Sequence, residues 1–82
     1  MSAEKMLMVY DQKIVHCSKL IRALDHEVEL VKASYEQGLL KSKRIFNHYI
    51  KRAENKKSEY LKLQDEYFRK MDFIKKQRSI LA

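Results

Sequence analysis

The sequence predicts an all-α fold, a long antiparallel helical hairpin with coiled-coil-like packing. Three observations support this prediction. The 82-residue chain has no proline and a single glycine, its first half repeats apolar residues every three or four positions, and the repeat changes phase near that glycine, Gly38. Proline and glycine are the residues that disfavour a helix interior most strongly, so their scarcity favours long helices.

The first half of the chain carries an unbroken heptad pattern. Its two series, each with members seven residues apart, are Leu7, Ile14, Ile21, Val28 and Tyr35, and Tyr10, Cys17, Leu24 and Val31. Two interleaved series of this kind are typical of a helix whose apolar seam is covered by another helix. We predict a helix over about residues 3–36, preceded by Ser2, because serine is a favourable N-cap residue.

The pattern breaks around Gly38. Continuing the first heptad would place Gly38 and Ser42 in the seam, whereas a new seven-residue repeat begins at Leu39. Glycine readily takes the left-handed conformation that follows many helices, so we predict a turn over about residues 37–42. Two alternatives remain open: one bent helix with a four-residue phase step, and a three-helix form with a second break at residues 55–58.

The second helix is predicted over about residues 43–80. Its repeat continues from Leu39 through Phe46, Ala53, Tyr60, Tyr67, Ile74 and Leu81. Further apolar residues widen the stripe to about 140°, which is broader than a two-stranded seam needs. A chain of this length buries little core alone, and its lone cysteine allows no internal disulfide. We therefore expect one helical domain over residues 1–82, completed to a three- or four-helix bundle by another chain.

The expected partner is a protein, either a second copy of this chain or a different chain, bound through coiled-coil packing. The residues that we expect at this partner or oligomer interface come from the apolar stripes of both helices. They are Leu7, Tyr10, Ile14, Cys17, Ile21, Leu24, Val28, Val31, Tyr35, Phe46, Tyr49, Tyr60, Leu63, Tyr67, Met71 and Ile74.

The basic charge lies in the second half of the chain. Residues 1–38 contain five Lys or Arg against six Asp or Glu, whereas residues 39–82 contain thirteen against five. Within this half, a candidate patch for an anion or an acidic partner consists of Lys41, Arg44, Lys51, Arg52 and Lys56. Such a patch suits an acidic protein surface, a nucleic acid or an anionic membrane, and it also suits a face that is only solvated.

Catalytic chemistry has no motif in this sequence. His16, His26 and His48 are too far apart to share one helical turn, and a single glycine excludes a phosphate-binding loop. We expect no catalytic residues, no metal site and no cofactor. The sequence also has no apolar run of the length that spans a bilayer, and we expect an intracellular protein of the cytoplasm or nucleus.

The function that we expect is therefore non-enzymatic. A small helical hairpin of this kind serves as a subunit, adaptor or chaperone that assembles with itself or with a partner protein. The alternative is a small basic protein that binds nucleic acid through the patch within residues 41–57.

Overall fold

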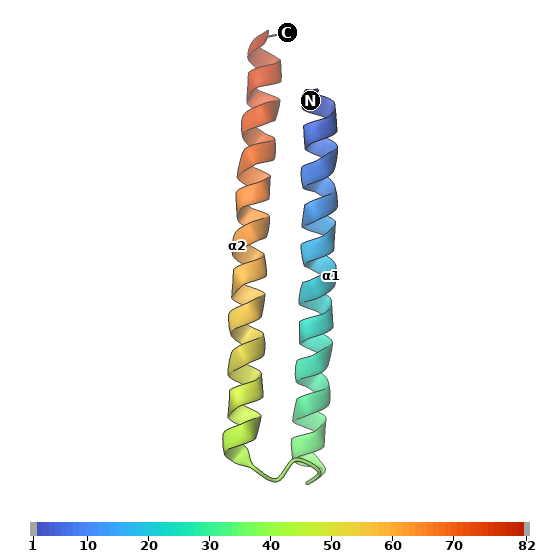
Figure 1. Ribbon diagram of the computed structural model, residues 1–82, viewed down its shortest axis with the longest axis vertical. Helices are drawn as coiled ribbons and strands as arrows, with labels where there is room; N and C mark the ends of the chain where they lie inside the picture. The colour runs from blue at the N-terminus through green and yellow to red at the C-terminus, as the bar shows by residue number, and fades with distance from the viewer. Residues whose placement is uncertain (1, 82) are drawn as a thin grey trace.

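Two long antiparallel helices make up the fold. The computed structural model describes residues 2–81, and its side chains over residues 2–79. Helix α1 spans Ala3–Glu36 and helix α2 spans Lys43–Leu81, and together they form a hairpin of 62 × 16 × 15 Å (Figure 1). The predicted all-α helical hairpin is confirmed, whereas neither the single bent helix nor the three-helix form occurs.

Each helix begins at a serine cap. The Ser2 hydroxyl accepts a hydrogen bond from the Lys5 amide at 3.3 Å, and the Ser42 hydroxyl accepts one from the Ile45 amide at the same distance. An N-cap serine satisfies a backbone donor that has no partner inside the helix. In the sequence, Ser42 indicated only that the first heptad does not continue beyond Gly38. Its role as the cap of α2 is a finding of the structure.

Helix α1 ends in a Schellman motif around Gly38. The Gly38 amide donates to the Tyr35 carbonyl at 3.1 Å, and the Leu39 amide donates to the Ser34 carbonyl at 2.9 Å. This pair of bonds requires the left-handed conformation, and Gly38 has a φ of 77°. The chain can therefore reverse direction within the six residues between the two helices.

The seam between the helices is narrower on α2 than the sequence indicated. All the seam residues predicted on α1 are buried or half-buried against α2. On α2 the buried and half-buried residues follow two series, which are Phe46, Ala53, Tyr60, Tyr67 and Ile74, and Ile50, Lys57, Gln64 and Met71. Lys57 and Gln64 of the second series are polar, so a search for apolar repeats in the sequence did not identify this series as part of the seam.

Those polar seam residues set the register of the two helices. The Gln64 amide donates to the Ile14 carbonyl at 3.0 Å and to the Ser18 hydroxyl at 2.7 Å. Lys57 forms an ion pair of 2.9 Å with Asp25. Sliding α2 along α1 by a heptad would break all three contacts, so these residues specify one alignment among several that the apolar repeat permits.

Gly38→Ala is expected to lower the free energy of unfolding by about 1 kcal/mol, because alanine strains the left-handed region. A β-carbon at this position would meet nothing within 4 Å, so the cost comes from the backbone alone. Urea unfolding followed by circular dichroism measures the change. Gln37→Ala is the matched control, because Gln37 has an ordinary right-handed conformation. Equal losses in both variants would contradict the assignment of strain to Gly38.

Ile14→Ala tests the seam itself. Ile14 is 8% exposed and its neighbour Val15 is 48% exposed, so the pair compares a core position with a surface one. Truncation of Ile14 should cost about 2–4 kcal/mol, whereas Val15→Ala should change the free energy of unfolding by less than about 0.5 kcal/mol. Urea unfolding at equal protein concentration provides both values. A loss in Val15→Ala as large as in Ile14→Ala would show that the seam is assigned to the wrong face.

Candidate interaction surface

Most of the predicted interface residues lie together in the contact between α1 and α2. The nine on α1 face α2, and Phe46, Tyr60, Tyr67, Met71 and Ile74 face back from α2. Aromatic pairs join them at both ends of the hairpin. The Tyr35 and Phe46 rings stack at 4.4 Å near the turn, and the Tyr10 and Tyr67 rings lie 5.9 Å apart near the open end. That these residues also bind another chain stays a prediction.

Tyr49 and Leu63 lie elsewhere. They are 44% and 37% exposed and occupy one flank of the helix contact, where residues recur seven positions apart. The flanking row on α2 is Tyr49, Lys56, Leu63, Lys70 and Gln77, and the row that faces it on α1 is Met6, Lys13, Leu20 and Glu27. Between antiparallel helices, rows of this kind meet on the same side of the seam.

Three adjoining hollows run along this flank, and together we call them the flank groove. The hollow nearest the turn, of about 310 Å³, is lined by Leu24, Glu27, Tyr49, Arg52, Ala53, Lys56 and Tyr60. The middle hollow, of about 470 Å³, is lined by Val9, Gln12, Lys13, His16, Cys17, Leu20, Tyr60, Leu63 and Tyr67. The hollow at the open end, of about 590 Å³, is lined by Ala3, Met6, Tyr10, Arg69, Lys70, Phe73, Ile74 and Gln77.

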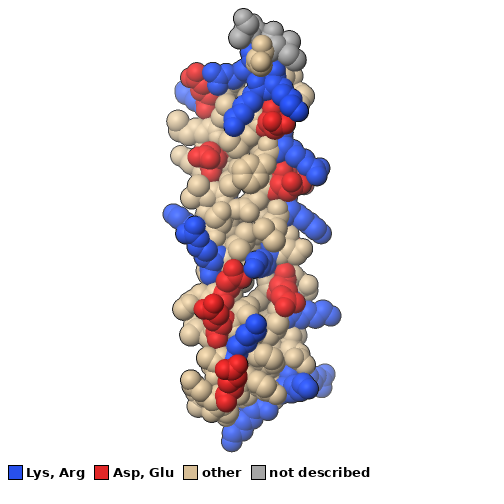
Figure 2. Space-filling view, turned by 180° about the vertical axis from the view of Figure 1, so that it is seen from behind, with Lys and Arg blue, Asp and Glu red and all other residues tan. Residues whose placement is uncertain are grey.

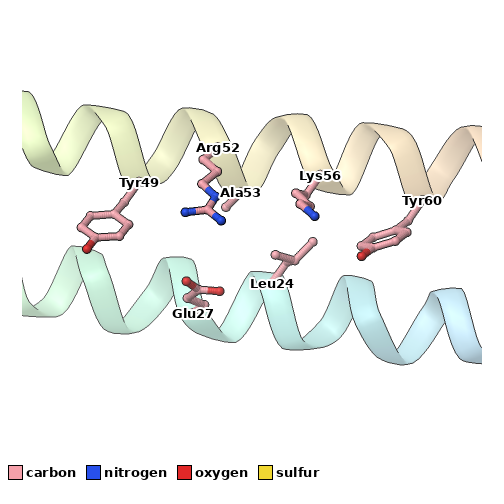
Figure 3. Close-up of a pocket in the computed structure, with 7 residues that line it drawn as sticks. All are labelled: Leu24, Glu27, Tyr49, Arg52, Ala53, Lys56 and Tyr60. Atoms are coloured by element: carbon pink, nitrogen blue, oxygen red, sulfur yellow. The ribbon is translucent and has the colours of Figure 1, made fainter.

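The hollow nearest the turn shows how the two helices build the groove. Tyr49 and Tyr60 of α2 stand at its two ends, and Leu24 of α1 rises between them (Figure 3). Arg52 and Glu27 face each other across it (Figure 3). The floor is therefore apolar and small, with Ala53 buried beneath, while aromatic and charged side chains form the walls.

Exposed apolar side chains from both helices line the groove. They are Val9 of α1 and Tyr49, Leu63 and Phe73 of α2, and each of the three hollows has at least one of them. Single exposed apolar residues are ordinary on protein surfaces. Several of them along one concave flank are typical of a surface that binds a helix or another apolar element.

The opposite side of the hairpin exposes as many large apolar side chains as the groove, but the row beside the seam on α1 is polar there. Figure 2 shows acidic, basic and uncharged side chains interspersed there, with acidic ones gathered over the turn-proximal part of α1. Exposed Met8 and Val15 of α1 and exposed Leu61 and Phe68 of α2 are on this side. A row that includes Asp11, Ser18 and Asp25 runs between them on α1. This side supplies matched control positions for the flank groove.

The predicted basic patch extends from the flank groove onto the outward surface of α2. Arg52 and Lys56 line the groove, Arg52 also lines an outward hollow with Arg44 and Lys51, and Lys41 lies in the turn. An acidic stretch of α1 lies near it in the hairpin. The neighbouring stretch of α1, residues 25–36, carries four acids and one lysine, and Asp25 pairs with Lys57.

Among the described residues, no group of three His, Cys, Asp or Glu side chains is placed to hold a metal ion. Over the same residues, no helix is long and apolar enough to cross a membrane. Comparison with known protein families, curated proteins and solved structures finds no match to this chain.

Proposed function

We propose that this protein is a non-enzymatic interaction module whose flank groove binds an amphipathic helix of another protein. The observation that carries the proposal is the continuity of three hollows along one flank, with exposed apolar residues in each. The groove extends over about 25 residues of α1 and α2, or about 40 Å, the length of a helix of similar size. A third helix laid there would complete a three-helix bundle.

The hairpin exposes more surface than a compact monomer of its mass, which supports the binding of another chain. The hairpin exposes 6808 Å². A compact monomer of the same mass exposes about 5,200 Å², so the difference is about 1,600 Å². Stable protein interfaces bury about 1,600 Å² in total, which is about 800 Å² of each partner. The surplus is therefore large enough for one interface of ordinary size along the groove.

The thin core gives a physical reason for binding. Ile14, Cys17 and Ala53 are the buried apolar residues of the described part of the chain, and each is small or of medium size. A partner that binds only the folded hairpin stabilises it by mass action. A subunit, an adaptor or a chaperone of this kind would each bind its partner by docking a helix in the groove.

Leu63→Asp tests the groove, and Leu61→Asp is its matched control. The two leucines are two residues apart on α2, Leu63 lines the groove, and Leu61 lies on the other side. The probe is a synthetic amphipathic peptide of about three heptads, with leucine at the seam positions and glutamine elsewhere. Leu63→Asp should weaken its binding at least about tenfold, and Leu61→Asp by less than about twofold, as measured by fluorescence anisotropy.

Cys17 provides a second readout of the same binding. Cys17 is 5% exposed and lines the middle hollow, so a docked helix should slow alkylation of its thiol further. Absence of peptide binding to the wild-type protein, or equal weakening by both aspartate substitutions, would rule out helix docking in the groove. Circular dichroism of each variant separates loss of binding from loss of the hairpin.

Nucleic acid is the second candidate ligand, on one observation. Arg44, His48, Lys51 and Arg52 line a single hollow on the outward surface of α2, which places three cations together. Closely spaced cations on one helix face release counterions from a phosphate backbone.

This candidate predicts binding of a labelled oligonucleotide that weakens steeply with salt. Arg44→Gln with Lys51→Gln should reduce the slope of log Kd against log salt by about two. Lys62→Gln with Lys75→Gln removes the same charge from α2 outside the patch and should leave the slope nearly unchanged. Anisotropy titrations across a salt series measure both. No binding at low salt would exclude this candidate.

A further inference from the structure

The charges along the flank groove point to the chemistry of the helix that it binds. Resting on the proposed function, we infer that the partner helix belongs to a different chain and carries acidic residues beside its apolar stripe. Five Lys or Arg side chains line the three hollows, against one carboxylate, that of Glu27. The five are Lys13, Arg52, Lys56, Arg69 and Lys70.

Three of these cations carry the inference. Arg69 pairs with Asp65 at 3.0 Å, which balances its charge in part, and Arg52 points toward Glu27 (Figure 3), so these two are set aside. The remaining three are the lysines at positions 13, 56 and 70. Over the described side chains, none of the three has a carboxylate oxygen within 4.0 Å.

Two of the lysines are held at the groove by aromatic rings. The Lys13 ammonium lies 5.5 Å from the centre of the Tyr67 ring, and the Lys70 ammonium lies 5.9 Å from the centre of the Tyr10 ring. A cation over an aromatic face is attracted by the ring quadrupole. These contacts keep both charges beside the apolar floor, where a docked helix would meet them.

The spacing of the lysines matches a helical ligand. Lys56 and Lys70 are fourteen residues apart in one row of α2, which is two heptads, or about 21 Å along the helix. A partner helix with glutamates at flanking heptad positions would present carboxylates at the same period. Its leucine-type residues would then fill the hollows while its acids meet the lysines on the rim.

A second copy of this chain fits the groove poorly. Two copies docked groove to groove would bring the same five cations of each into one interface. Like charges placed together across an interface oppose binding. The occupant that the groove favours is therefore an acidic amphipathic helix from another protein.

Three peptides with the same apolar pattern test this inference. Their flanking positions carry glutamate, glutamine or lysine. The glutamate peptide should bind at least about tenfold more tightly than the lysine peptide at low salt, and the difference should shrink as salt rises. Lys56→Glu with Lys70→Glu leaves three cations and three carboxylates along the groove and should abolish the preference. Lys51→Glu with Lys75→Glu changes the net charge equally outside the groove and should preserve it.

Each outcome has a distinct meaning. Equal binding of the three peptides would overturn the acidic partner and leave helix docking intact, whereas binding of none would remove both. Loss of the preference in the control pair as well would show attraction by the net charge of the chain, +7 in the wild type, and would overturn the role of the groove lysines. A dimer in light scattering that Leu63→Asp dissociates would identify a second copy as the occupant, against the inference.

Discussion

The structure depends on one constraint, which is that a single seam joins only two helices. A side chain between two helices is covered from one direction and remains open to both flanks. Even the best-covered residues, such as Ile14 and Cys17, are few, and most seam residues are half-buried. The alignment of α2 on α1 is therefore specified by individual polar contacts as well as by apolar burial. Among these contacts are the hydrogen bonds of Gln64 and the Lys57–Asp25 ion pair.

The flank groove follows from the same constraint. Where three helices meet, the space beside each seam is filled by the third, but here it stays open on the side of Tyr49 and Leu63. The floor of that space is apolar, and the ammonium groups of Lys13 and Lys70 lie beside it, over the Tyr67 and Tyr10 rings. A helix that docked there would exchange hydrated apolar surface for packed contacts and gain charge complementarity at the rim.

The hairpin could be predicted from the sequence because its signals are local. The heptad from Leu7 to Tyr35 and the phase change at Gly38 both depend on residues near one another in the chain. The groove could not be predicted in this way. Its position depends on the rotation of α2 about its own axis, which turns Lys57 and Gln64 toward α1. Tyr49 and Leu63 had the apolar character of seam residues, but this rotation places them on a flank.

The turn at Gly38 closes one end of the hairpin and leaves the other end open (Figure 1). Contacts near the turn, such as the stacked Tyr35 and Phe46 rings, join residues close in sequence, so their loop closes at low entropic cost. The contact of Arg78 with Glu4 spans nearly the whole chain. We therefore expect separation of the helices to begin at the open end, where Met6 and Phe73 line the groove. The turn would be the hinge of that motion, so the groove would widen first at the end farthest from it.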